Sequence, residues 1–383
     1  MLKLIRITTV PISLEKLLEN QLRYMSQFYE VVAVSSDEVN LKKVGNKQGV
    51  RTFTIDMTRT ISPLKDLFSL IKMIKFLRKE KPAIVHTHTP KAGTVGMIAA
   101  KIACVPHRLH TVAGLPLLEA TGNRRTLLNF VEKLTYKCAT GVYPNSHGLA
   151  DLILQNKLCS RHKIKVLANG SSNGIDTTYF NPEIYSFSEK DKVKQELGLI
   201  DTDFVYIFVG RIVRDKGVNE LVKAFLSINV KYPQSKLLLV GSYESELDPL
   251  LPDTLKRIKE NSSIIEVGYQ FDVRLYFAIS DVLVFPSYRE GFPNVVMQAG
   301  AMGLPSIVSN INGCNEIVIE NENGIIIPVK NTEKLYDAMD SVVSSDFLIN
   351  KMKQNARKMI VSRYEQIVVW NSLLEEYKKI EDV

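Results

Sequence analysis

Short apolar runs rich in valine and isoleucine alternate along the chain with longer segments of helical period. In the first half the runs predict strands and the longer segments predict helices, because apolar residues recur there every three to four positions. The predicted strands are 2–10, 30–35, 51–56, 83–87, 108–112, 141–144 and 165–167. The predicted helices are 14–29, 64–81, 93–103, 125–139 and 148–155. This alternation is typical of βαβ units around a parallel sheet.

The alternation stops at residues 169–199, which are rich in Ser, Asn, Gly and Pro and then in charged residues. We interpret this stretch as the connection between two domains. The pattern then resumes, with strands at 204–209, 236–240, 264–267, 281–285 and 306–309. The helices predicted with them are 218–231, 249–260, 273–279, 293–302 and 333–344, followed by 347–361 and 365–380.

The sequence therefore predicts an α/β protein built from two Rossmann-like, doubly wound domains. We expect an N-terminal domain at 1–185, a second domain at 186–361, and a C-terminal helix at 362–383 that packs back toward the first domain. In such folds ligands bind at the carboxyl ends of the strands, so a ligand cleft is expected between the two domains.

Composition narrows the class of protein. The chain has 383 residues, 45% apolar and 23% charged, which suits two soluble globular domains. No apolar run approaches the roughly 20 residues that cross a bilayer, and the start lacks the features of a signal peptide. The four cysteines are far apart and form no CxxC pair. Free thiols in a reducing cytoplasm are the plain interpretation.

Charge is distributed unevenly between the two halves. Residues 1–180 hold 26 Lys and Arg against 12 Asp and Glu, whereas residues 181–383 hold 23 against 29. We expect the first half to meet an anionic partner: nucleic acid, an anionic membrane surface or a phosphate-bearing substrate. Charge alone does not choose between these three.

The densest chemical signal follows the strand predicted to end at Phe285. A loop carries the sequence SYREGFPN, and a helix is predicted to begin near its proline, where backbone N–H groups can meet phosphate oxygens. The acid of this loop can accept hydrogen bonds from sugar hydroxyls. The donor-binding candidates are Glu290, Gly291, Phe292, Pro293, Asn294 and, about two helical turns later, Gln298.

A second signal follows the strand at 204–209. Gly210 permits close backbone approach, and two cations, Arg211 and Lys216, stand five residues apart before the next helix. Such cations can bracket a diphosphate with charge-assisted hydrogen bonds. The alternative is a solvated loop of mixed charge.

A third segment, HTHTPKAG, ends a strand and enters a helix. His86 and His88 alternate onto one strand face, but the sequence shows no third ligand with suitable spacing for a metal. We expect this segment to line the cleft, with Lys91 on a phosphate of the second substrate.

These motifs resemble those of glycosyltransferase family four, a large retaining group with the GT-B fold. The family hallmark is two glutamates separated by seven residues in this strand-loop-helix setting. Here the first is Glu290, and Gln298 stands in place of the second. The resemblance implies that Glu290 contacts the transferred sugar, Gln298 the ribose, and Arg211 with Lys216 the leaving diphosphate. It covers nearly the whole chain and is strongest at 204–330.

Within the first domain the resemblance is to members that act on polyprenyl-diphosphate sugars. It implies an acceptor site that includes Thr9, His88, Lys91 and Gly114. Ala113 stands where many members have a histidine that contacts the sugar, so His110 on the same strand becomes a second catalytic candidate beside Glu290.

The expected function is transfer of a sugar from a nucleotide-diphosphate sugar, UDP favoured, to a polyprenyl-diphosphate-linked or other glycan acceptor in surface polysaccharide biosynthesis. No cofactor and no metal are expected, because cations at the diphosphate can do the work of a divalent ion. Two alternatives stay open: a non-hydrolysing sugar-nucleotide epimerase of the same architecture and a nucleic-acid-binding protein. No aromatic-basic interleaving supports the latter, and nucleic acid is not an expected partner.

Two stretches of the basic half have a possible membrane role. Residues 64–79 place apolar positions 64, 67, 68, 71 and 74 among five basic residues, and 117–137 is of the same type. One interpretation is a helix packed on its sheet with a solvated basic face. The other is peripheral contact with the anionic inner face of the cytoplasmic membrane.

Overall fold

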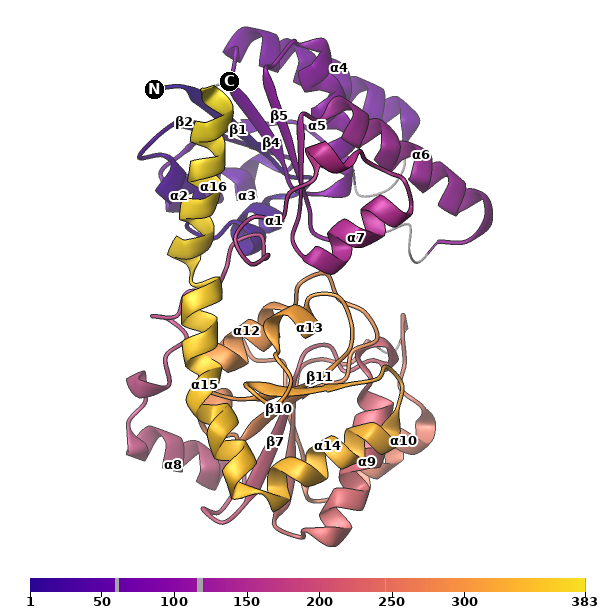
Figure 1. Ribbon diagram of the computed structural model, residues 1–383, viewed down its shortest axis with the longest axis vertical. Coiled ribbons are helices and arrows are strands. Elements are labelled where there is room, and N and C mark those ends of the chain that lie inside the picture. Colours follow the sequence, from indigo (N-terminus) through magenta and orange to yellow (C-terminus); the bar gives the residue numbers. More distant parts are fainter. Residues whose placement is uncertain (59–61, 116–119, 245, 383) are drawn as a thin grey trace. The chain divides into compact units, whose positions relative to one another are not determined.

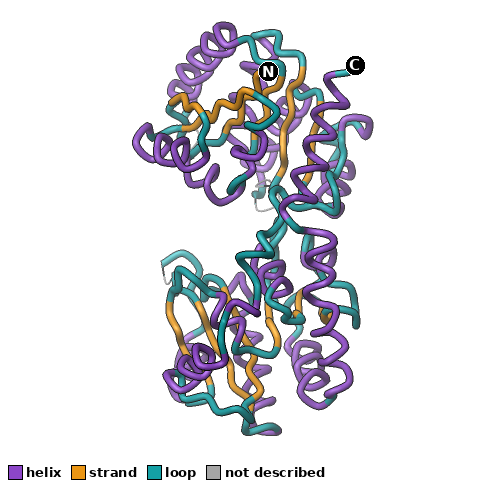
Figure 2. Tube along the Cα trace, turned by 90° about the vertical axis from the view of Figure 1, so that its left-hand side faces the viewer, coloured by secondary structure: helices purple, strands orange, loops and turns teal. Residues whose placement is uncertain are grey.

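The computed structural model describes residues 1–58, 62–115, 120–244 and 246–382. The chain forms two compact units (Figures 1 and 2). Unit 1 is Met1–Gly174 with Ile367–Val383, and unit 2 is Ile175–Gln366. The units thus divide at 174/175 and 366/367, where the sequence led us to expect 185/186 and 361/362. Each unit contains one parallel six-stranded sheet, which confirms the predicted α/β class.

The sheet of unit 1 has the strand order β3-β2-β1-β4-β5-β6, and all its paired strands are parallel. In this register Arg6 lies opposite His86, and Thr87 lies opposite His110. The two central strands are β1 and β4. The strands are β1 (Lys3–Ile7), β2 (Glu30–Ser35), β3 (Arg51–Thr54), β4 (Ile84–Thr87), β5 (His107–Val112) and β6 (Gly141–Pro144).

Alternate strand residues of unit 1 pack against two different layers of helices. One cluster joins Ile5, Ile7 and Val85 to the helices α4 to α7, and the other joins Leu4, Ile84 and α16 (Figure 1). Because side chains alternate along a strand, every second residue faces the same layer. The helices are α1 (Pro11–Leu17), α2 (Gln21–Met25), α3 (Glu38–Gln48), α4 (Pro63–Glu80), α5 (Pro90–Ile102), α6 (Gly122–Cys138), α7 (His147–Gln155) and α16 (Gln366–Glu381).

Two expectations for unit 1 were wrong, and one helix was missed. The helix predicted at 14–29 is two helices, separated near Asn20, whose positive φ of 60° interrupts the helical path. Helix α3 was missed, because its residues are largely polar. The strand predicted at 165–167 does not form, and only an isolated bridge joins Val142 to Ile164.

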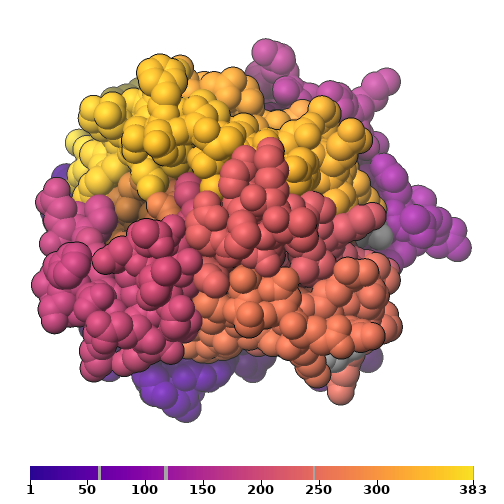
Figure 3. All heavy atoms as spheres, turned by 90° about the horizontal axis from the view of Figure 1, so that it is seen from below, coloured from indigo at the N-terminus to yellow at the C-terminus, as the bar shows by residue number. Residues whose placement is uncertain are grey.

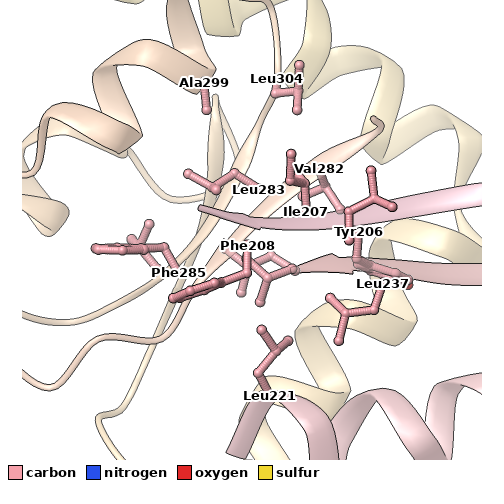
Figure 4. Packing of buried hydrophobic residues seen from close by; sticks show 14 of the residues in the cluster. Tyr206, Ile207, Phe208, Leu221, Leu237, Val282, Leu283, Phe285, Ala299 and Leu304 are labelled. Carbon is pink, nitrogen blue, oxygen red and sulfur yellow. The ribbon is translucent and has the colours of Figure 1, made fainter. Parts of the chain in front are cut away.

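The sheet of unit 2 has the order β12-β11-β10-β7-β8-β9 and is also parallel throughout its paired strands. The rings of Phe208 and Phe285 lie 6.1 Å apart at the ends of the neighbouring strands β7 and β10 (Figure 4). Two packed aromatic rings thus lie near the carboxyl ends of these two strands. The strands are β7 (Phe204–Val209), β8 (Ser235–Val240), β9 (Ile264–Gly268), β10 (Val282–Phe285), β11 (Ser306–Ser309) and β12 (Gly324–Ile327).

The helices of unit 2 cover both faces of its sheet, and α9 and α14 pack against each other on the surface seen in Figure 3. Helix α8 lies within the stretch expected to be an irregular connection. Its start is fixed by a capping box between Ser186 and Glu189 rather than by an apolar period. The helices are α8 (Phe187–Glu196), α9 (Val218–Lys231), α10 (Pro252–Glu260), α11 (Arg274–Ala278), α12 (Asn294–Ala301), α13 (Cys314–Ile317), α14 (Thr332–Ser344) and α15 (Asp346–Tyr364).

Candidate functional site

Glu290 lies in the loop that joins β10 to α12 in unit 2. Its Oε1 atom forms an ion pair with Lys216 Nζ and accepts a hydrogen bond from Ser287 Oγ at 2.9 Å. The Lys216 and Glu290 side chains are only 16% and 17% exposed. Within the described residues no donor reaches Oε2, so that oxygen remains available to a ligand. The structure thus brings together the predicted sugar-binding acid and one predicted diphosphate-binding cation.

A glycine sets the position of Lys216. The lysine ends a short 3-10 turn, and Gly217 follows with a positive φ of 72°. A Cβ on Gly217 would lie 2.2 Å from the backbone oxygen of Pro286, so only glycine lets this turn pack against the Glu290 loop. The backbone N–H of Tyr288 also donates a hydrogen bond to the backbone carbonyl oxygen of Asp215 at 2.9 Å. These contacts hold the two loops together.

Arg211 lies apart from this pair. It follows Gly210, whose N–H donates to the Val240 oxygen at 3.0 Å and holds the turn against β8. Arg211 Nη1 contacts Glu244 Oε2 at 2.6 Å, and the Arg211 side chain is about half exposed. Exposed ion pairs of this kind stabilise a protein by about 0–1 kcal/mol and break easily. In this structure, then, the two predicted diphosphate cations have different acidic partners.

The remaining donor-binding candidates surround the amino end of α12. Gly291 O accepts a hydrogen bond from Asn312 Nδ2 at 2.8 Å, and the Phe292 ring lies 5.4 Å from that of Tyr364. Pro293 is the N-cap residue, Asn294 is exposed in the first turn, and Gln298 is half-buried further along the helix. The candidates therefore lie on one continuous loop and helix, as predicted.

Two contributors to this site were missed from the sequence. Ser287 is fully buried and bonds Glu290, and Cys314 is fully buried at the start of α13. Burial raises the pKa of the Cys314 thiol well above its usual value, and the nearby Glu290 carboxylate raises it further while Lys216 lowers it. The thiol is therefore neutral. A serine three residues before the loop acid was the one available signal for Ser287.

The acceptor candidates of unit 1 lie at or just beyond the ends of β1, β4 and β5. Thr9 Oγ1 lies 2.7 Å from Thr89 Oγ1, which links the ends of β1 and β4. Lys91 Nζ pairs with Asp66 Oδ2 at 2.5 Å. Gly114 lies beyond β5 with open space around it. Residues 116–119, which include the start of the predicted membrane-surface stretch 117–137, lie outside the described residues.

His110 occupies an interior position, on the opposite sheet face from His86. Its ring packs against Gly93 of α5, where a Cβ would lie 2.4 Å from Cε1, and its Nδ1 lies 2.7 Å from Thr87 Oγ1. Burial lowers the pKa of His110 to about 4. Only 3% of the residue is exposed, and a contact of His110 with the transferred sugar stays a prediction.

His86 and His88 do face one side of the sheet, with ring centroids 4.3 Å apart. Their bonded nitrogens contact protein groups: His88 Nε2 accepts from Arg6, and His86 contacts Tyr377 and Thr111. Across the described ranges, no cluster of three His, Cys, Asp or Glu side chains is arranged to hold a metal ion.

Comparison with known proteins identifies the family. The family described as Glycosyl transferases group 1 matches residues 189–359, and the family described as Glycosyl transferase 4-like matches residues 16–146. The capsular polysaccharide biosynthesis glycosyltransferase CapM of Staphylococcus aureus is 34% identical over 376 residues, which cover 98% of this chain and 96% of that protein. The chain belongs to the group 1 glycosyltransferases.

Another relative of this glycosyltransferase is named for its action on a lipid-linked sugar. The UDP-Gal:alpha-D-GlcNAc-diphosphoundecaprenol alpha-1,3-galactosyltransferase of Escherichia coli is 30% identical, over 99% of this chain and 96% of that protein. The crystal structure of Anabaena HepE in complex with UDP has a TM-score of 0.82 at 18% identity, over 98% of this chain and all of that chain. That likeness confirms the predicted GT-B class, two Rossmann-like units.

Proposed function

We propose that this glycosyltransferase moves a sugar from a UDP-sugar to a sugar on a polyprenyl diphosphate, with retained anomeric configuration and without a divalent metal. The observation that carries the proposal is the cluster of Glu290, Lys216 and Ser287 at adjacent strand ends of unit 2. It offers a carboxylate oxygen to sugar hydroxyls beside a cation that can meet the donor phosphates. The names of the Escherichia coli and Staphylococcus aureus relatives support the choice of donor, acceptor and polysaccharide product.

In the proposed reaction an acceptor hydroxyl oxygen bonds to the anomeric carbon as the bond from that carbon to the phosphate oxygen breaks. UDP leaves with the electron pair, and the hydroxyl proton passes to a phosphate oxygen. Retention requires attack on the face that UDP leaves, either together with departure or through a short-lived ion pair. Lys216 stabilises the charge that develops on the leaving phosphate, and Glu290 orients the sugar.

We further propose that unit 1 contacts the inner face of the cytoplasmic membrane through α4 and α6. Helix α4 packs on the core of unit 1 through Ser69, Met73, Phe76 and Leu77, and Ile74 of the apolar stripe is partly buried beside them. The other four residues of the stripe are exposed to solvent, with Phe68 at 73%. They are Leu64, Leu67, Phe68 and Ile71, and Lys65, Lys72 and Lys75 are exposed beside them.

Helix α6 presents a second surface of the same kind. Leu127 and Phe130 are exposed, and Arg124 and Arg125 are exposed in the same half of the helix. Exposed apolar residues among basic ones are typical of helices that lie on an anionic lipid surface. Throughout the described residues no helix is long and apolar enough to span a bilayer.

The test is a donor screen with UDP-, GDP- and other nucleotide sugars, with and without a short-chain prenyl-diphosphate sugar as acceptor. We expect product only with acceptor present, full activity in excess chelator, and an α-anomer from an α-linked donor by NMR. Donor turnover without acceptor would favour an epimerase. Loss of activity in chelator that manganese restores would refute metal independence, and an inverted anomer would refute retention.

A further inference from the structure

Arg6 is a fully buried cation in a central strand of unit 1, and its hydrogen-bonding partners are all neutral. It has no exposed surface, and none of the ion pairs formed by the described residues includes it. The guanidinium donates hydrogen bonds to His88 Nε2 at 3.0 Å, to Tyr377 Oη at 3.1 Å and to Gln21 Oε1. Burial lowers the pKa of Arg6, yet a guanidinium keeps its proton in proteins. A positive charge without a balancing carboxylate thus lies inside this unit.

Such an arrangement opposes folding. Buried charges in proteins are normally paired, because removing an ion from water is costly and only a nearby opposite charge offsets that cost. An apolar residue on β1 would avoid the cost, as Leu4 does two positions earlier on the same face. A function of the positive charge would explain why an arginine occupies this buried position.

Arg6 also fixes the protonation of His88. An arginine only donates, so His88 Nε2 must accept, and the single proton of the neutral ring is on Nδ1. Desolvation, and then the charge of Arg6, hold the pKa of His88 well below its usual value. His88 Nδ1 is buried and has no hydrogen-bonding partner among the described residues. The ring therefore carries an N–H group without an acceptor.

The neighbouring His86 differs from His88 in that neither of its ring nitrogens lacks a partner. His86 Nδ1 lies 2.6 Å from Tyr377 Oη, and His86 Nε2 lies 2.8 Å from Thr111 Oγ1, so both ring nitrogens have a hydrogen-bonding partner. Every donor and acceptor of the His86 ring is satisfied. The spare N–H belongs to His88 alone, which directly follows β4 at the carboxyl edge of the sheet.

The surroundings of His88 favour an anion. The next residue, Thr89, is the N-cap of the 13-residue helix α5, whose first turn holds Lys91 and no acidic residue. The amino end of a helix carries a partial positive charge. Asp66 is paired with Lys91 and so does not neutralise Arg6. The buried charge, the helix end and the free N–H all act in the same direction.

We propose that Arg6 is a positioning residue for the acceptor: its buried charge draws a phosphate-bearing group to the end of β4, and it holds His88 with Nδ1–H ready for an oxygen of that group. The group is the diphosphate of the acceptor, so this assignment rests on the proposed function. Neither His88 nor Arg6 takes part in the bond-breaking step.

The test separates the charge of Arg6 from its hydrogen bonds. Arg6→Gln removes the charge, and Arg6→Lys keeps the charge but loses the three hydrogen bonds of the guanidinium. Tyr377→Phe keeps the charge and removes only the two hydrogen bonds of Tyr377 Oη, with Arg6 and with His86. With a soluble prenyl-diphosphate sugar, we expect Arg6→Gln to raise the acceptor KM roughly tenfold, the scale of one charge acting across about 10 Å of protein. Donor KM should not move, and Tyr377→Phe should change the acceptor KM less than about threefold. Arg6→Lys, which keeps the charge but loses the bond to His88, should raise the acceptor KM less than Arg6→Gln does.

A second measurement does not depend on turnover. Inorganic pyrophosphate is titrated by calorimetry into protein already saturated with UDP, so that the donor site is filled. We expect binding to wild type and to Arg6→Lys, and much weaker binding to Arg6→Gln. This result would uphold the site even if the proposed acceptor were wrong. Equal losses in all three variants, or no pyrophosphate binding to folded wild type, would overturn the proposal. Fluorescence of Trp370, the single tryptophan, reports whether each variant keeps α16 in place.

Discussion

Lys216 and Glu290 meet at one carboxylate oxygen, Glu290 Oε1, which also accepts a hydrogen bond from Ser287. The pair connects two loops that follow β7 and β10, strands that are neighbours in the sheet. A donor that places its sugar on Glu290 would therefore have its phosphates within reach of Lys216. Because Lys216 contacts Glu290 and Arg211 contacts Glu244, substitution of Lys216 is the more direct test of the predicted diphosphate site.

Replacing Lys216 with alanine should lower kcat/KM by roughly 10²–10³, the scale of one lost electrostatic contact to the transition state. The matched control is Lys223→Ala, an exposed lysine on the adjoining helix α9. The same loss is expected for Arg211→Ala if Arg211 leaves Glu244 when the donor binds. Steady-state kinetics measure these effects. An unchanged kcat/KM in Lys216→Ala would show that Lys216 does not contact the diphosphate.

A second prediction separates Glu290 from Gln298. Glu290→Gln should mainly reduce kcat, because contacts to the reacting sugar strengthen as charge develops. Gln298→Ala should mainly raise the donor KM, by the ~1 kcal/mol of a neutral hydrogen bond to ribose. Gln298→Glu should be tolerated. A collapse of kcat in Gln298→Ala with the donor KM unmoved would show that the two roles are reversed.

The alternating pattern was sufficient to predict both sheets and most of their strands, because buried parallel strands are read directly as short apolar runs. It missed α3 and α8, whose starts depend on local capping by Asp37 and Ser186 rather than on apolar period. It also missed β12, a short strand at the sheet edge.

The grouping of the donor-site candidates was predictable where they belong to one segment, as at Glu290 to Gln298, which forms the expected loop and helix start. It was not predictable where partners come from distant parts of the chain. Arg6 gave no signal from the sequence, because its partner Tyr377 is 371 residues away. His110 was chosen because it precedes Ala113 on the same predicted strand, and the sequence did not show that its ring packs against Gly93 of α5.

The exposed stripe on α4 leads to a third prediction, on membrane binding. Phe68→Ser should weaken binding to vesicles of any composition, because it removes apolar area from the lipid contact. Lys65→Glu with Lys72→Glu should weaken binding only to vesicles that contain phosphatidylglycerol, by roughly tenfold or more at ~1 kcal/mol per basic residue. Co-sedimentation with phosphatidylcholine vesicles, with and without phosphatidylglycerol, measures both effects.

The control for that experiment is Phe347→Ser, which removes an equally exposed phenylalanine from α15 in unit 2. Its vesicle binding should match that of wild type. If Phe347→Ser and Phe68→Ser weaken binding equally, the contact is not specific to α4. If the lysine variants bind phosphatidylglycerol vesicles as wild type does, anionic lipid is not the partner.

The last prediction concerns the buried histidines of unit 1, which should lower the stability of that unit in acid. All six histidines lie in unit 1, and burial holds the pKa of His110 at about 4. An unfolded chain binds a proton at His110 below about pH 6.5, whereas the folded unit does not until about pH 4. The free energy of unfolding should therefore be unaffected by His110 above pH 6.5 and fall as the pH drops toward 4, by about 3 kcal/mol from this residue. His86 and His88, whose pKa values burial also lowers, should add to the effect.

Urea unfolding followed by Trp370 fluorescence between pH 7 and 4 measures this loss of stability in unit 1. His110→Asn should lower the pH dependence, since its amide can still bond Thr87 but does not titrate, while His162→Asn, at an exposed position, should leave it unchanged. A wild-type unfolding free energy that stays flat across this range would show that His110 is protonated inside the folded unit.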